Sequence, residues 1–162
     1  MTRWADRPTE VANLLNPAFC GRLLIECAEQ YGRPLPFEFA VLVLPIVLHR
    51  DTRTKLPRSI ATSMQTWIER NPEVRVGFAE RVRDLAPFTR EALRFSLTHG
   101  RLRFRPDAGA FEPERRGKRR GRRATGPETA EVRDCLVAAG LIGRWFAVST
   151  PSAIYSLWGI RP

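Results

Sequence analysis

"LPFEFAVLVLPIVL", residues 35–48, is the longest apolar run in the chain. It is apolar on nearly all sides, which is typical of a helix enclosed by a core or by an interface. The length of the run favours a helix, and a buried strand over 41–44 is the alternative. Pro45 is expected to kink the helix, because proline removes a backbone donor and crowds the preceding turn. The run contains Glu38 and is shorter than the roughly 20 residues that span a bilayer.

The segments on either side of this run predict a helical N-terminal half. Asn16 can cap a helix and Pro17 suits its first turn, while Gly32 is expected to end it. "HRDTRTKLPRS", residues 49–59, reads as a polar, basic connection. The apolar run is therefore expected to be a buried helix between a capped amphipathic helix and a charged loop.

Three further helices are predicted over 60–70, 72–86 and 89–99. The second has apolar residues at spacings of four, four and three, which is a strong amphipathic signal. Pro87 is expected to break the chain between the second and third helices, with Thr89 as the cap of the third.

The pattern changes after residue 100. "RLRFRP", residues 101–106, alternates apolar and basic residues as a half-buried strand does, and a turn and a return strand over 107–114 follow it. A helix is expected beyond residue 128, bent or divided near Gly140 because two glycines interrupt it. "AIYSLWGI", residues 153–160, reads as a final strand.

This order of elements predicts a mostly helical α+β fold in a single domain over 1–162. Residues 1–86 form its helical part, and residues 87–162 form a winged-helix-like part with a small β-sheet. A basic loop over 112–127 lies within the second part.

The basic loop holds a concentrated tract of cations. Residues 112–123 carry seven positive and two negative charges, a net of +5, which is half of the +10 of the whole chain. Counterion release favours contact of such a tract with the DNA backbone, and the lack of interleaved aromatic residues predicts no sequence preference. An acidic protein surface is a second explanation. A solvated loop enriched by codon usage is a third, since the chain has 25 arginines and two lysines. The candidate nucleic-acid-binding residues are Arg115, Arg116, Lys118, Arg119, Arg120, Arg122 and Arg123.

No pattern of catalytic or metal-binding residues stands out, so neither an enzyme nor a cofactor is expected. The chain lacks a Walker loop, an H-E-x-x-H and a G-x-S-x-G motif. His49 and His99 read as surface or helix-end residues, and Arg50 is expected to lower the pKa of His49. Three cysteines without a C-x-x-C pair indicate reduced, buried thiols. With no signal peptide or membrane span, the expected location is the cytoplasm.

Two groups of apolar residues are candidates for binding a partner protein. Aromatic residues crowd the C-terminus, where Trp145, Tyr155 and Leu157 lie off the predicted inward stripes. Phe39 and Leu42 belong to the apolar run that opens this section. Interface cores favour aromatic residues, but the alternative is that all five residues lie in the core of the chain itself.

Five stretches of the chain, in order, resemble the middle component of bacterial three-component ABC systems. They are "NPAF" (16–19), "LVLPIVLHRDTRTKLPRS" (42–59), "WIERNPEVRVGFAERVRDLAPFTREAL" (67–93), "GRWFA" (143–147) and "TPSAIYSLWGIRP" (150–162). The resemblance implies a protein encoded between a large SMC-like ABC ATPase and a third, sensor or effector, component. It implies no catalytic residues.

The resemblance implies a non-enzymatic adaptor that joins the ATPase to the effector in an anti-phage defence complex. The basic loop would then lie near double-stranded DNA held by the ATPase. The alternative hypothesis is a free-standing winged-helix DNA-binding protein that regulates transcription.

Overall fold

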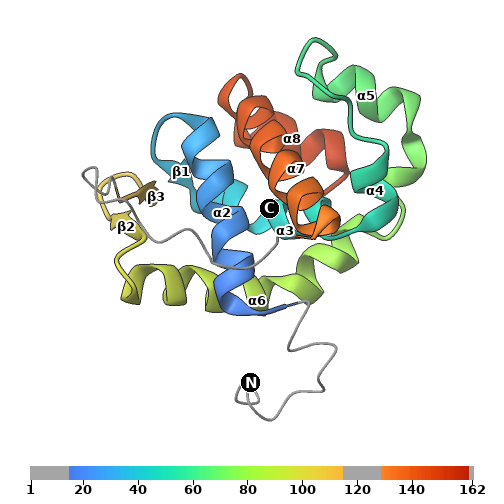
Figure 1. Cartoon of the computed structure of the whole chain (residues 1–162). Coiled ribbons are helices and arrows are strands. Elements are labelled where there is room, and N and C mark those ends of the chain that lie inside the picture. The colour runs from blue at the N-terminus through green and yellow to red at the C-terminus, as the bar shows by residue number, and fades with distance from the viewer. Residues whose placement is uncertain (1–14, 115–128, 161–162) are drawn as a thin grey trace.

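A computed structural model describes residues 15–114 and 129–160, and these residues form seven α-helices, one short 3-10 helix and a three-stranded sheet (Figure 1). The α-helices are α2 (Pro17–Tyr31), α3 (Phe37–Val47), α4 (Arg50–Thr54), α5 (Met64–Arg70), α6 (Phe78–Thr98), α7 (Ala130–Ala147) and α8 (Pro151–Trp158). The remaining elements are η2 (Pro72–Arg75), β1 (Leu35–Pro36), β2 (Leu102–Arg105) and β3 (Ala110–Pro113).

Helices α2 and α7 lie side by side at the front of the view in Figure 1. They run parallel, since Cys27 of α2 lies beside Gly143 of α7 and Arg33, just beyond α2, donates a hydrogen bond to the carbonyl of Ala147. The predicted boundaries of α2 are confirmed. Oδ1 of Asn16 accepts a hydrogen bond from the backbone N–H of Ala18 at 2.8 Å, and Gly32 ends the helix with a φ of 77°.

The predicted division of the helix near Gly140 is wrong. Helix α7 is one helix of 18 residues, and its glycines lie against α2. A Cβ atom at Gly143 would lie 2.3 Å from the carbonyl oxygen of Cys27, and one at Gly140 would lie 3.2 Å from Oε1 of Glu26. The two glycines therefore allow close packing of the helices, which outweighs their low helix propensity.

The apolar run forms α3, as predicted, and every residue from Phe39 to Val47 except Val41 is buried. Pro45 lies within the last turn of the helix. The ring of Phe39 stacks on that of Phe146 of α7, with centroids 4.4 Å apart. The run therefore packs into the core of the chain itself.

The predicted break at Pro87 is also wrong, because Pro87 lies inside α6, which is one continuous helix of 21 residues. Thr89 lies inside the helix, fully buried, and its Oγ1 donates a hydrogen bond to the carbonyl of Leu85 at 3.1 Å. Proline is costly inside a helix when nothing else holds the helix in place. Here α6 packs against both α2 and α3, and this packing stabilises one continuous helix across Pro87.

The predicted hairpin over 101–114 is confirmed as β2 and β3, and the antiparallel sheet has the order β1-β3-β2. The final strand predicted over 153–160 is wrong, because this segment forms α8. Ile154 and Trp158 are buried on one face of that helix. A spacing of four residues fits an alternating strand and one face of a helix equally well, and the hydroxyl of Thr150 caps the helix.

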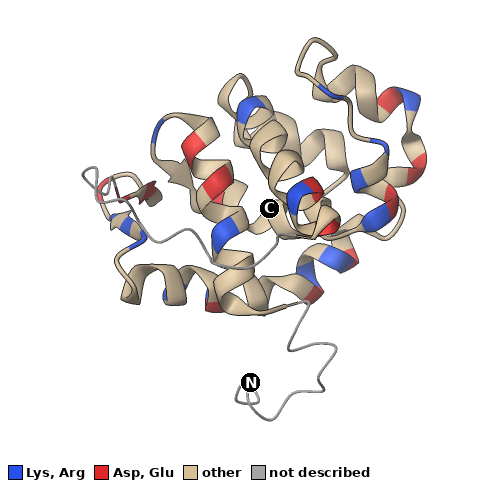
Figure 2. Cartoon of the chain, viewed as in Figure 1, with Lys and Arg blue, Asp and Glu red and all other residues tan. Residues whose placement is uncertain are grey.

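The observed fold is therefore a mostly helical α+β fold, as predicted. The third strand of the sheet comes from residues 35–36 rather than from the C-terminus, so the winged-helix-like arrangement stays a prediction. In the view of Figure 2, basic and acidic residues are interspersed on the described helices.

Candidate interaction site

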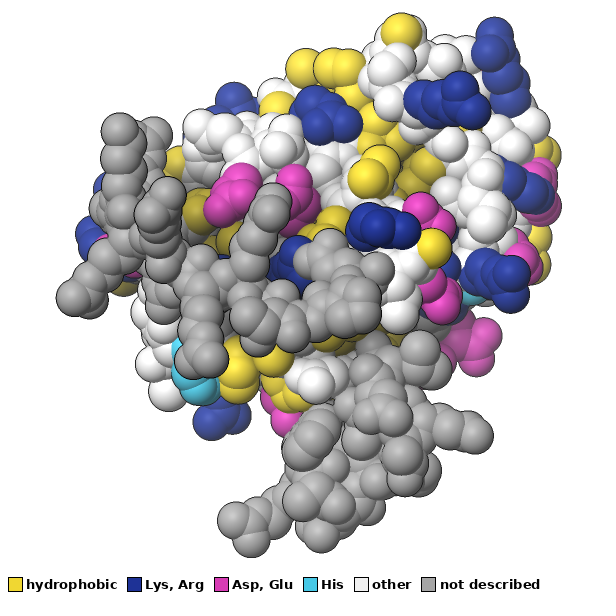
Figure 3. All heavy atoms as spheres, in the orientation of Figure 1, with side chains coloured by type: hydrophobic (Ala, Val, Ile, Leu, Met, Phe, Trp, Pro, Cys, Tyr) yellow, Lys and Arg dark blue, Asp and Glu magenta, His cyan; other side chains and the backbone are white. Residues whose placement is uncertain are grey.

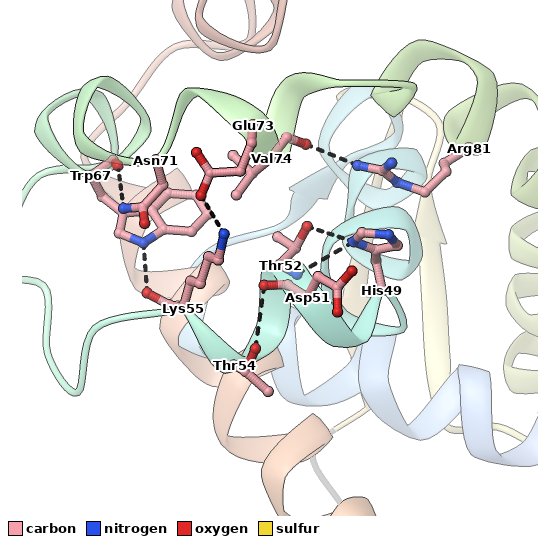
Figure 4. Close-up of polar contacts among 10 residues, drawn as sticks. All are labelled: His49, Asp51, Thr52, Thr54, Lys55, Trp67, Asn71, Glu73, Val74 and Arg81. Atoms are coloured by element: carbon pink, nitrogen blue, oxygen red, sulfur yellow. Dashed lines mark hydrogen bonds and ion pairs between the residues drawn. The ribbon is translucent and has the colours of Figure 1, made fainter.

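The basic connection predicted over 49–59 begins with a short, well-anchored helix, α4 (Figure 4). His49 caps this helix: its Nδ1 accepts the backbone N–H of Thr52 at 3.3 Å and lies 2.8 Å from the hydroxyl of the same residue. The pKa of His49 is lowered by burial and by the nearby positive charge of Arg81, whereas Asp51 acts in the opposite direction. The predicted direction is thus confirmed, with burial and Arg81, rather than Arg50, as the causes.

Arg53 joins three elements through one side chain that is only 8% exposed. Its Nη1 donates to the carbonyl of Val47 at the end of α3, at 2.8 Å, and its Nη2 pairs with Oε1 of Glu131 on α7, at 2.9 Å. Hydrogen bonds to a charged group stabilise a fold more than neutral ones do. Arg53 therefore links α4 to both α3 and α7.

The segment after α4 is tied to α5 and η2 on its other side (Figure 4). The indole N–H of Trp67 donates to the carbonyl of Lys55 at 2.8 Å, and the side-chain amide of Asn71 donates to the carbonyl of Trp67 at the same distance. Lys55 also pairs with Glu73, which lowers the pKa of that carboxyl. The α4–α5 connection is thus held at several points.

A groove of about 590 Å³ lies between this connection and the outer face of α7. We call it the α4–α7 groove. Its apolar surface is supplied from both sides by Leu56, Pro57, Val137, Ala138 and Leu141. Its charged rim consists of four arginines and two acids: Arg50, Arg53, Arg58, Arg144, Glu131 and Asp134. In Figure 3, hydrophobic side chains lie between basic ones over α7 and the α4–α5 region.

A second, more apolar pocket of about 650 Å³ lies on the other side of Arg53. Phe19 of α2, Leu48 after α3, Leu85 of α6 and Val132 of α7 line it. Arg53 and Glu131 border both cavities, so their ion pair separates the pocket from the α4–α7 groove.

The described residues contain neither a cluster of metal ligands nor an exposed thiol. Within 15–114 and 129–160, no group of three or more His, Cys, Asp or Glu side chains is placed to hold a metal ion. All three cysteines are free and buried, as predicted. Burial, with a smaller contribution from Glu91, raises the pKa of Cys20 to about 12, and burial also raises the pKa of Cys27 and Cys135. These thiols are therefore protonated and poorly nucleophilic at neutral pH.

The basic tract from Arg115 to Arg123 lies outside the described residues. Among the helices that the structure describes, none is both long and apolar enough to cross a membrane.

Three of the five predicted partner-binding residues lie in the core. Phe39 and Leu42 are 0% exposed and Trp145 is 1% exposed. The indole N–H of Trp145 donates to the carbonyl of Thr62 at 3.0 Å, so even its polar atom has a partner within the chain. These three side chains therefore lie in the core of the chain itself, which was the alternative in the sequence analysis, and could meet a partner only if the core opened.

The other two predicted residues, Tyr155 and Leu157, are partly exposed on α8 and remain available to a partner. The hydroxyl of Tyr155 donates to the carbonyl of Glu38 at 3.0 Å, which also ties α8 to α3. The sequence interpretation missed the α4–α7 groove. One signal for it is Val137, which lies off the apolar stripe of α7 and is 68% exposed.

The fold is a small, mostly helical one, and its described part carries the α4–α7 groove and the neighbouring apolar pocket. The chain belongs to the family described as ABC-three component (ABC-3C) system Middle Component 3, which it matches over residues 4–162. No curated protein and no solved structure matches the chain.

Proposed function

We propose that this protein is a non-enzymatic adaptor that links an SMC-like ABC ATPase to an effector or sensor in a bacterial anti-phage defence complex. The match of residues 4–162 to a middle-component family carries the proposal, since a middle component has at least two other components to work with. Nearly the whole of the given sequence belongs to this match.

The surface of the described residues supports this proposal. An apolar groove rimmed by arginines resembles the centre and rim of a protein interface more than a site for a small substrate. The charged connection that borders the groove is anchored on both sides, so a partner would meet a preformed surface and would pay little entropy to order it.

The basic tract is assigned a separate role, contact with double-stranded DNA held by the ATPase. Residues 115–128 carry seven basic side chains and one acidic one, so they hold a net +6 of the +10 of the chain. Such a density of arginine favours phosphate contacts that do not depend on base sequence.

Co-expression of the chain with the ATPase encoded beside it, followed by size-exclusion chromatography at micromolar concentration, tests the adaptor role. The expected result is one peak that contains both proteins, and addition of the third component shifts that peak to larger size. Separate elution of the chain and the ATPase would refute the proposal. Sequence-specific DNA binding by the isolated chain would favour a transcriptional regulator instead.

The DNA contact has its own test. A variant with all seven basic residues of the tract changed to glutamine is compared with the wild-type complex over a range of salt concentrations. The wild-type complex should lose affinity for DNA steeply as salt rises, and the variant should show a shallower slope. Equal slopes would show that the tract makes no phosphate contacts.

A further inference from the structure

The charges around the α4–α7 groove are not balanced within the described part of the chain. Arg53 is neutralised by Glu131, and neither Arg50 nor Arg58 forms an ion pair with any residue of 15–114 or 129–160. Arg144 donates a hydrogen bond to the neutral side chain of Gln30 at 3.1 Å and forms no ion pair with a described residue. Three arginines that form no ion pair with a described residue therefore border the groove.

Asp134 is the remaining acid on the rim, on the α7 side. These three arginines against one acid leave an excess of about two positive charges in the groove. Arg50 and Arg58 are both exposed, so they meet a partner without first losing an internal contact.

The floor between these charges is apolar and open to solvent. Val137 is 68% exposed in the middle of α7, although its neighbours Ala138 and Leu141 on the same helix are buried. Leu56 and Pro57 face it from the opposite wall and are only partly buried. An apolar strip between two charged rims fits one face of an amphipathic helix.

We propose that the α4–α7 groove binds an acidic amphipathic helix of a partner protein in the same three-component system. The apolar ridge of that helix packs against Val137 and Leu56, and its carboxylates pair with Arg50 and Arg58. Arginine suits this role, because its planar fork binds a carboxylate through two parallel hydrogen bonds. This inference rests on the adaptor function proposed above and names the chemistry of the surface that the adaptor recognises.

Two other occupants fit the groove less well. The apolar floor offers nothing to a DNA backbone, and Asp134 on the rim would repel phosphates. A second copy of the chain would carry the same arginines and the same net charge of +10. In a symmetric dimer, Arg50 and Arg58 of the two copies would face each other and repel.

Charge reversal tests the ionic half of the proposal. We expect R50E/R58E to weaken binding of the intact chain to its partner at least tenfold, with most of the salt dependence lost. The matched control is R90E/R94E, which makes the same change of net charge on exposed arginines of α6 that do not border the groove. The control should bind as the wild type does, and its thermal unfolding shows whether either variant has lost its fold.

An uncharged substitution tests the apolar half. V137Q keeps a similar side-chain volume, suits a helix better than valine and places a polar group on the floor of the groove. Its control is V148Q, since Val148 is 75% exposed and lies outside the groove. We expect V137Q to weaken partner binding at least threefold and V148Q to leave it unchanged.

Zero-length cross-linking identifies the partner chemistry directly. The chain has two lysines, Lys55 and Lys118, so amine chemistry has a low background. R58K keeps the positive charge and introduces an amine at the groove, which carbodiimide would couple to a partner carboxylate within direct contact. Mass spectrometry of the cross-linked complex should then place the coupled Asp or Glu on a predicted amphipathic helix.

The outcomes separate this inference from the adaptor proposal. If the wild type binds the partner and R50E/R58E binds equally well, the groove assignment is overturned and the adaptor role stands. If R50E/R58E loses affinity for DNA but not for the partner protein, the occupant is a nucleic acid and the inference is wrong. If the wild type binds no component of its system, both proposals fall.

Discussion

Replacement of Gly143 by alanine should destabilise the protein, although alanine is the better helix former. Intrinsic propensity favours alanine in a helix interior by about 1 kcal/mol. Packing opposes it, because the added Cβ would lie 2.3 Å from the carbonyl oxygen of Cys27 and 3.1 Å from Cβ of Gln30. The nearest contact is a backbone atom inside α2, so a side-chain rotation cannot relieve the clash.

The size of the effect follows from the separation that the two helices would need. A carbon atom approaches a carbonyl oxygen no closer than about 3.3 Å, so α2 and α7 must move apart by about 1 Å near Gly143. A gap of that size forfeits a quarter to a half of the dispersion energy of the contacts that it opens. Overpacking of this kind costs up to about 3 kcal/mol, which leaves a net loss of about 2 kcal/mol after the gain in propensity.

Gly140 provides the matched control on the same face of the same helix. A Cβ there would meet Oε1 of Glu26 at 3.2 Å and Cγ of Gln30 at 3.3 Å, and both are atoms of flexible side chains. G140A should therefore be neutral or slightly more stable than the wild type. Urea unfolding followed by circular dichroism measures the free energy of unfolding of both variants. In thermal unfolding, a loss of 2 kcal/mol for G143A corresponds to a fall in Tm of roughly 4–8 °C.

If G143A unfolds at the same urea concentration as G140A, or at a higher one, the reasoning is refuted. In that case helix propensity would decide the outcome and the close approach of α2 and α7 would carry no energetic weight.

Three further results are expected. G21A should destabilise the chain, because its Cβ would lie 2.4 Å from Oγ of Ser96, and S96A should restore part of the loss in that background; additive effects of the two changes would contradict this contact. Because burial and Arg81 lower the pKa of His49, protonation disfavours the folded state, so stability should fall as the pH drops below about 6.5. H49N retains an acceptor for the N–H of Thr52 and should show a smaller fall in Tm between pH 7.5 and 5.5, whereas an equal fall would show that other groups cause it. The three thiols should react slowly with a thiol reagent at pH 8 and rapidly in denaturant, and fast reaction of Cys20 in the folded protein would contradict its pKa of about 12.

Local signals in the sequence were sufficient to predict an element where the local pattern is compatible with only one structure. Asn16, Pro17 and Gly32 determine both ends of α2, and alternation of apolar residues identifies the hairpin of β2 and β3. The same reasoning failed at Pro87, at Gly140 and in the segment that forms α8. In each of these cases the local pattern allows two structures, and contacts with distant elements select one of them.

The candidate site was likewise only partly predictable from the sequence. The charge of the connection over 49–59 is plain in the sequence, but its position opposite α7 depends on the ion pair of Arg53 and Glu131, which are 78 residues apart. Likewise, the composition marks Phe39 and Trp145 as apolar without showing whether they face a partner or the core.

The sequence by itself determined a mostly helical α+β chain with an enclosed apolar helix, three buried thiols and a concentrated basic tract. It did so because helix caps, apolar periodicity and net charge act between residues that are close in the chain. Only the tertiary structure decided that α2 and α7 meet through glycines, that α6 continues across Pro87 and that a groove opens beside α7. These features arise from contacts between distant residues, whose energies outweigh local preferences of about 1 kcal/mol per residue.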